Sequence, residues 1–117
     1  MESEKIVIFA FRGDPICFVH VLLNAIDFHA NGKEGLIILE GDSVTLVEKM
    51  TSDSHFLHIL YQKAKDLGII HGACKACSVK LKADTAIKAE GIPLIGDMSG
   101  HPSMNTFMEN GYRVITF

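Results

Sequence analysis

Two cysteines, Cys74 and Cys77, stand at a C-x-x-C spacing directly after a short apolar run, Ile69–Ala73. If that run is a buried strand, a helix starts beside the cysteines, and the unpaired N–H groups of a helix start favour a thiolate. Lys75 adds a full positive charge between them, so we expect a lowered pKa for Cys74. The thiolate is the nucleophilic and metal-binding form of cysteine. Cys74 is therefore the predicted reactive residue, and Cys77, one helical turn later, is a predicted auxiliary thiol.

Three kinds of chemistry remain open for this pair. A thioredoxin-like redox site is disfavoured, because in that fold the pair follows an early strand and here it follows the third. A zinc site would take Cys74 and Cys77 as two ligands and would need His71 and His101 to complete a tetrahedron. No second cysteine pair is present, so a metal is not the favoured prediction. The third possibility is that Cys74 carries a sulfur atom as a persulfide.

Composition excludes several classes of protein. The formal charge of −3 argues against an electrostatic grip on nucleic acid. No apolar stretch is long enough to span a membrane, and an odd count of three cysteines does not suit a secreted disulfide framework. Neither G-x-x-x-x-G-K nor G-x-G-x-x-G follows the first apolar run, so no nucleotide or other cofactor is predicted. We expect a cytoplasmic protein with reduced thiols.

Hydrophobic runs, and the capping and turn residues that separate them, predict the elements that position the cysteines. Five strands are expected, at Lys5–Phe11, Gly35–Glu40, Ile69–Ala73, Ile92–Ile95 and Tyr112–Phe117. Helices are expected at Pro15–Ala30, at Val44–Met50, from a Ser52-Asp53 cap to Gly68, at Ser78–Glu90 with a break near Ala83-Asp84, and at Pro102–Asn110. The broadly apolar helix Pro15–Ala30 is expected to face a neighbouring subunit as well as the sheet.

This alternation predicts one α/β domain over residues 1–117. It is a three-layer sandwich with a five-stranded, mainly parallel sheet, flavodoxin-like or Rossmann-like. Ligands of such folds gather where the strands end at their carboxyl side. The side chains expected along that rim, besides the cysteines, are Arg12, Asp42, His71, Lys75 and His101. These residues form the predicted pocket around Cys74.

Several stretches resemble the DsrE/DsrF family. They include Leu23-Asn24-Ala25 in the first helix, Cys74 after the third strand, Gly91-Ile92-Pro93 before the fourth, and the segment Phe107–Ile115. The resemblance implies a small cytosolic subunit that assembles into homotrimers or hexamers. It also implies that Cys74 accepts a persulfide sulfur from a donor protein and passes it to an acceptor. Cys77 departs from the sulfur-relay members, which need one cysteine, and so leaves a disulfide or a metal open. Sulfur carriage on Cys74 is therefore the leading prediction. The alternatives are a non-enzymatic oligomeric protein that binds a small ligand or a metal, and a thiol-redox protein that uses Cys74 and Cys77.

Overall fold

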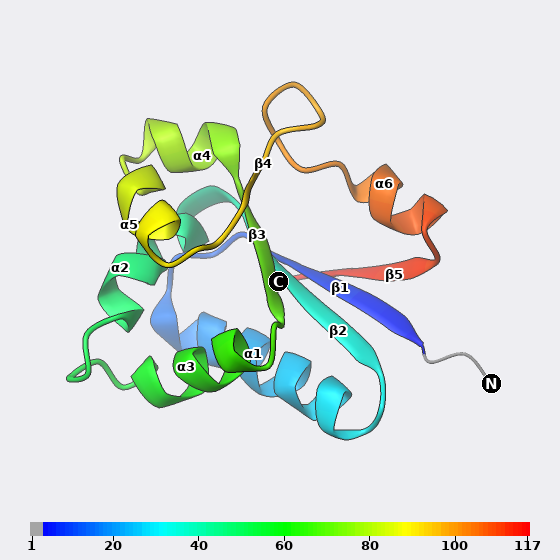
Figure 1. Ribbon diagram of the computed structural model, residues 1–117, viewed down its shortest axis with the longest axis horizontal. Helices are drawn as coiled ribbons and strands as arrows, with labels where there is room; N and C mark the ends of the chain where they lie inside the picture. Colours follow the sequence, from blue (N-terminus) through cyan, green and yellow to red (C-terminus); the bar gives the residue numbers. More distant parts are fainter. Residues whose placement is uncertain (1–3) are drawn as a thin grey trace.

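The computed structural model describes residues 4–117, and the first three residues of the predicted domain lie outside them. Five strands form one sheet in the order β4-β3-β2-β1-β5, and every pairing is parallel. The strands are β1 (Lys5–Ala10), β2 (Glu34–Leu39), β3 (Ile70–Cys74), β4 (Leu94–Ile95) and β5 (Tyr112–Thr116) (Figure 1). The predicted five-stranded parallel sheet is confirmed.

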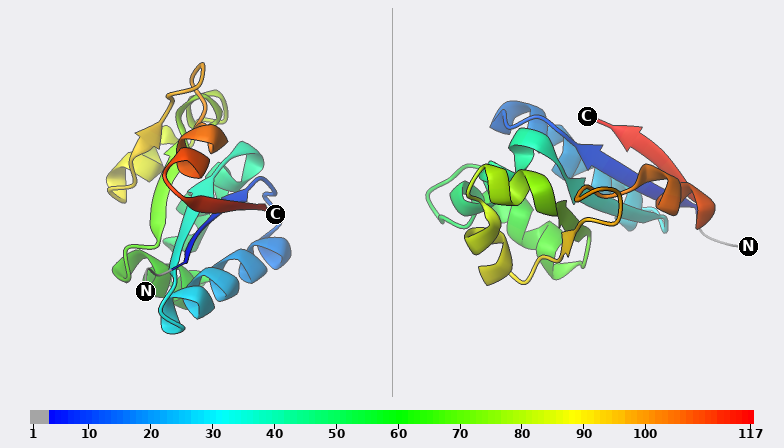
Figure 2. Two further views of the ribbon diagram at one scale, coloured as in Figure 1. Left: turned by 90° about the vertical axis from the view of Figure 1, so that its right-hand side faces the viewer. Right: turned by 90° about the horizontal axis from the view of Figure 1, so that it is seen from above.

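Chain order explains how the helices are distributed over the sheet. From β1 to β4 the strands follow one another in a single direction, so right-handed crossovers place their helices on one face. The last crossover returns from β4 to the far side of β1 and brings its helix to the opposite face (Figure 2). The helices are α1 (Pro15–Ala30), α2 (Leu46–Met50), α3 (His58–Asp66), α4 (Lys75–Lys80), α5 (Asp84–Ala89) and α6 (Met104–Glu109), with a 3₁₀ turn η1 at Gly41–Thr45. The result is the predicted three-layer, flavodoxin-like sandwich.

The two faces of the sheet bury cores of very different size. Side chains alternate along β1, so Ile8 joins one core and Val7 and Phe9 join the other. The larger core packs the sheet against α1, α2, α3 and α5. The smaller core contains Phe107, the buried residue of α6. The face that carries α6 is therefore covered by one short helix, which contributes the buried Phe107 and the partly buried Met104.

The helix expected from a Ser52-Asp53 cap begins later, at His58. The preceding residues form turns, in which Ser52 accepts a hydrogen bond from the His55 amide and the His55 ring accepts one from the Leu57 amide. Such local side-chain and turn bonds compete with helix formation. Phe56, which would lie in the first turns of the expected helix, is 63% exposed.

The helix expected over Ser78–Glu90 is two helices, of which the first begins earlier than predicted. α4 starts at Lys75, between the two cysteines, and the chain breaks before α5, as the Ala83-Asp84 signal indicated. Lys82 in the break has a φ of 57°, which a helix does not contain. Cys77 therefore lies in the first turn of α4, where its amide is free to bind the residue that caps the helix.

Two further features concern the edge of the sheet and the outer surface of α1. The strand expected at Ile92–Ile95 is shorter: β4 has two residues, lies at the edge of the sheet and directly follows Pro93, which cannot donate to a neighbouring strand. In α1 the exposed apolar side chains include Ile16 and Leu23, and burial of this helix between subunits stays a prediction. Among the described residues, none of the helices combines the length and the apolar character needed to cross a bilayer.

Candidate functional site

Four side chains that can donate to a metal or share protons meet at the carboxyl rim of the sheet. They are Glu40 after β2, Cys74 at the end of β3, Cys77 in α4 and His101 in the loop after β4, and their donor atoms all lie within 4.8 Å of one another. His101 Nδ1 is the common neighbour. It lies 3.2 Å from Cys74 Sγ, 3.3 Å from Glu40 Oε1 and 4.0 Å from Cys77 Sγ. We call these four residues the rim cluster.

Cys74 is held in place by the junction of β3 and α4. Its backbone is still extended and it caps α4, whose Cys77 amide donates to Cys74 Sγ at 3.3 Å. Its side chain is fully buried. Small residues around it make this possible, because Gly100 packs against Ala76 and accepts a hydrogen bond from the Ala76 amide at 2.9 Å. The strand-to-helix junction thus presents the sulfur to the 96–101 loop.

His101 is brought to the sulfur by a tight turn. Met98 and His101 exchange both backbone hydrogen bonds, and the two residues between them, Ser99 and Gly100, have φ values of 50° and 90°. Positive φ at both central positions is the mark of a type I′ turn, which glycine adopts without cost and serine does not. A strained backbone of this kind is common where a side chain must be aimed. Here it aims the imidazole at Cys74.

Glu40 extends β2 by one residue into the rim. Its side chain is 10% exposed, an unusual degree of burial for a carboxylate. Ser43 fixes the backbone, because its hydroxyl lies 2.7 Å from the Ala10 carbonyl and accepts from the Glu40 amide at 3.1 Å. The ends of β1 and β2 are thereby joined, and the Glu40 carboxyl is directed at His101.

Burial raises the pKa of Cys74 to about 12. The Cys77 amide lowers this pKa by donating to the sulfur, but the neighbouring Cys77 thiol and the Glu40 carboxylate raise it further. The expected lowering by the helix start and Lys75 is therefore wrong in sign, since removal of water outweighs one amide. Without a cation in the rim cluster, Cys74 is a protonated thiol at neutral pH.

The other predicted pocket residues do not join the rim cluster. Lys75 and Asp42 are exposed, and Asp42 packs against Gly13. Arg12 donates to Cys17 Sγ at 3.7 Å beside a cavity of only 10 Å³. His71 lies on the sheet face of α6, where its ring contacts Phe107 edge-to-face at 5.7 Å.

The predicted metal set is corrected in one member. Of Cys74, Cys77, His71 and His101, three belong to the rim cluster, and Glu40 stands where His71 was expected. Sequence reasoning missed Glu40, although one signal was there. Glu40 is a lone carboxylate at the carboxyl end of an apolar run, directly before Gly41.

The spacing of the rim cluster suits a tetrahedral metal ion. Metal–sulfur bonds of about 2.3 Å and metal–nitrogen bonds of about 2.0 Å place sulfur and nitrogen roughly 3.5 Å apart. The corresponding distances here are 3.2 and 4.0 Å. The His101 side chain is 41% exposed, so an ion has a route to the cluster from solvent. Two thiolates, an imidazole and a carboxylate form a donor set that Zn²⁺ accepts.

Comparison with known proteins places the chain beside proteins of unassigned function. No family model matches it. It is 33% identical over 97 residues to the uncharacterized protein MJ0733 of Methanocaldococcus jannaschii, covering 83% of this chain and 77% of that protein. A solved structure of the protein of unknown function BT1422 from Bacteroides thetaiotaomicron matches with a TM-score of 0.73 at 19% identity. That match covers 97% of this chain and 95% of the other, and it shows a shared fold.

Proposed function

This chain belongs to the same protein family as MJ0733 of M. jannaschii, and we propose that it is a metal-binding protein that holds one Zn²⁺ in the rim cluster. The observation that carries the proposal is the convergence of Glu40, Cys74, Cys77 and His101, whose donor atoms lie within 4.8 Å of one another. Such a site needs reduced thiols, which supports a cytoplasmic location.

The electrostatics of the rim cluster support a cation. Glu40 and Cys74 are both buried, and a buried anion is unfavourable unless an opposite charge accompanies it. A divalent ion supplies that charge and replaces the Cys74 proton, because a coordinating thiol is deprotonated. His101 would bind through Nδ1, which leaves its proton on Nε2. With four protein ligands the site is closed, as in structural zinc sites.

Cobalt titration tests the metal site directly. Reduced, metal-free protein is expected to bind one equivalent of Co²⁺ with a thiolate-to-cobalt charge-transfer band and the intense visible bands of a tetrahedral ion. One equivalent of Zn²⁺ should displace it. Cys77→Ala should lose a large part of the charge-transfer intensity, since one of the two sulfurs is removed, and Glu40→Gln should retain it, since both sulfurs remain. Cys17→Ser is the matched control, because Cys17 lies beside Arg12 and outside the rim cluster. A Cys77→Ala spectrum identical to that of the unmodified chain would overturn the proposal.

A second candidate, sulfur carriage on Cys74, is favoured by one contact. The Cys77 amide donates to Cys74 Sγ and would stabilise negative charge on that sulfur. In the transfer, His101 Nδ1 takes the Cys74 proton and the thiolate attacks the outer sulfur of a donor persulfide. The donor S–S bond breaks, the donor leaves as a thiolate and regains a proton, and Cys74 becomes a persulfide. The raised pKa and full burial of Cys74 oppose this step unless the 96–101 loop moves.

Intact mass after exposure to a persulfide donor separates the two candidates. A sulfur carrier is expected to gain the mass of one sulfur atom in metal-free form and much less when loaded with Zn²⁺. Cys17→Ser should gain the same mass. Equal uptake by Cys74→Ser would refute carriage on Cys74. The metal proposal does not depend on that result, because the cobalt spectrum tests it separately. The homo-oligomeric assembly implied by the family resemblance stays a prediction beside either candidate.

A further inference from the structure

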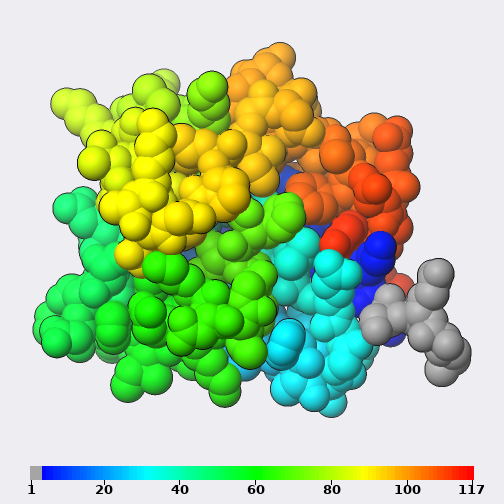
Figure 3. All heavy atoms as spheres, viewed as in Figure 1, coloured from blue at the N-terminus to red at the C-terminus, as the bar shows by residue number. Residues whose placement is uncertain are grey.

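A second candidate site lies away from the rim cluster, between α6 and the sheet. It is a cavity of about 390 Å³ lined by Lys5, His71, Ile95, Asp97, Thr106, Phe107, Asn110 and Tyr112. In the space-filling view the surface is hollowed between the atoms of α6 and those of β2 and β3 (Figure 3). This volume falls in the range of pockets that hold small organic ligands. None of the rim cluster residues lines it.

One wall of this pocket is aromatic. Phe107 contacts the rings of His71 and Tyr112 edge-to-face, with centroids 5.7 and 5.5 Å away. His71 reaches this wall because β3 carries one extra residue there. Ile37 pairs with Ile70 and Ile38 pairs with Gly72, so His71 has no partner on β2. A bulge of this kind redirects a side chain, and bulges are frequent beside functional sites.

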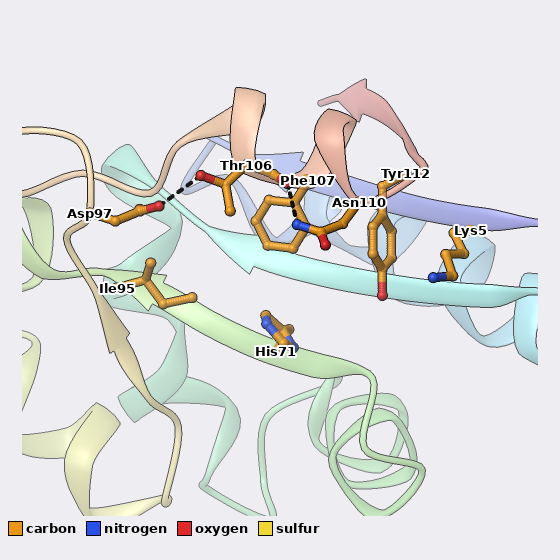
Figure 4. A pocket seen from close by; sticks show the side chains of 8 residues that line it. All are labelled: Lys5, His71, Ile95, Asp97, Thr106, Phe107, Asn110 and Tyr112. Atoms are coloured by element: carbon orange, nitrogen blue, oxygen red, sulfur yellow. Dashed lines mark hydrogen bonds between the residues drawn. The ribbon is translucent and has the colours of Figure 1, made fainter.

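The polar groups of the pocket are sorted by chemistry along its length (Figure 4). Lys5 stands at one end, where its ammonium lies 5.5 Å from the centre of the Tyr112 ring. Asp97 stands at the other end and accepts from the Ser103 amide and the Thr106 hydroxyl, one bond to each oxygen. A carboxylate has about four acceptor positions, so Asp97 can accept further bonds.

Donors and acceptors remain free along this length. Within residues 4–117, Lys5 has no ion pair and the His71 ring has no hydrogen bond. Asn110 donates its amide to the Thr106 carbonyl, so its side-chain oxygen stays available as an acceptor. The pocket therefore offers a cation at the Lys5 end, a carboxylate acceptor at the Asp97 end, and an aromatic wall between them, with Asn110 lying between Phe107 and Tyr112.

We propose that this pocket binds a small aromatic molecule that carries an anionic group at one end and an N–H donor at the other. The ring packs against Phe107 and Tyr112, the anionic group meets Lys5, and the N–H group donates to Asp97. Each end repels a ligand group that carries the same charge as its own side chain. The orientation of the ligand is thereby set by the two ends and its residence by the aromatic wall.

A dipolar probe with two matched fragments tests this inference. 4-(Aminomethyl)benzoate carries both groups, benzoate lacks the donor, and benzylamine lacks the anion. Titration of ¹⁵N-labelled protein should shift the amides of His71, Thr106 and Asn110, with 4-(aminomethyl)benzoate binding about two- to fivefold more tightly than either fragment. Shifts of equal size with all three probes, or no shift at these amides up to the solubility of the probes, would overturn it.

Variants at the two ends make the test specific. Lys5→Met should weaken 4-(aminomethyl)benzoate and benzoate by about two- to fivefold and leave benzylamine unchanged. Asp97→Asn should weaken 4-(aminomethyl)benzoate and benzylamine and leave benzoate unchanged. Lys63→Met is the matched control, because Lys63 is exposed on α3, which packs on the opposite face. If Lys5→Met binds all three probes as the unmodified chain does, the inference is wrong, whatever the metal content of the rim cluster.

Discussion

Zn²⁺ is expected to raise the free energy of unfolding of the reduced protein by about 4 kcal/mol once free Zn²⁺ reaches roughly a thousand times its dissociation constant. The reason is that only the folded chain assembles the ligands. Glu40 and His101 are 61 residues apart in sequence, and His101 and Cys74 are 27 apart. An unfolded chain offers Zn²⁺ only the adjacent cysteines, which bind it less tightly and reduce the gain somewhat. Urea unfolding at fixed free Zn²⁺ measures this stabilisation.

The Zn²⁺-dependent gain in unfolding free energy should distinguish substitutions inside the rim cluster from those outside it. Cys77→Ser should lose most of the Zn²⁺-dependent gain, and because Cys77 is only half-buried its metal-free stability should change little. Cys17→Ser and His71→Gln should keep the full gain, since neither residue belongs to the cluster. If the Glu40 carboxylate is the fourth ligand, Glu40→Gln should show a smaller Zn²⁺-dependent gain. A stabilisation that survives in Cys77→Ser would mean that Zn²⁺ binds elsewhere.

Phe107→Ala is expected to lower the free energy of unfolding by about 3–4 kcal/mol. Phe107 is the buried residue of α6, is 9% exposed, and contacts the rings of Phe9, His71 and Tyr112. Its removal leaves a cavity under a helix whose other contact with this core is the partly buried Met104, so the attachment of α6 to the sheet face should weaken. Urea unfolding measures the loss, and hydrogen exchange of the α6 amides should show it as local opening.

Two neighbouring variants define the reference for Phe107. Phe107→Leu keeps most of the volume and should cost about 1–2 kcal/mol. Met108→Ala lies one residue along the same helix, where Met108 is 61% exposed, and should change stability by about 0.5 kcal/mol or less. A Phe107→Ala loss as small as that of Met108→Ala would show that α6 is held to the sheet by something other than this side chain.

Local sequence signals predicted the elements wherever a single pattern dominated. Uninterrupted apolar runs marked β1 and β2. The helix expected at Pro15–Ala30 is α1, and Asp14 caps it by accepting from the Ile16 amide. The signals misled where two local preferences competed. Ser52 and Asp53 look like a helix cap, yet turns occupy the chain until His58. The helix after the cysteines was expected to begin at Ser78, and it begins at Lys75, between the two cysteines.

The sequence by itself determined the parallel α/β architecture and the position of Cys74 at the carboxyl rim. Both predictions depend on hydrophobic periodicity and on capping and turn residues, which are properties of neighbouring residues. It also identified three of the four rim cluster members, Cys74, Cys77 and His101. Only the tertiary structure decided the fourth, Glu40, because a carboxylate becomes a candidate ligand through the donors that face it across other strands.

Tertiary structure also decided the chemistry expected of the C-x-x-C pair. Spacing suggested a thiolate at a helix start, but burial raises the pKa of Cys74 to about 12 and makes the sulfur a thiol that a cation would deprotonate. The same applies to His71, which a one-residue shift in β3 places beside Phe107 on the face of α6. Desolvation and strand register depend on contacts between distant residues, and no spacing along the chain contains them.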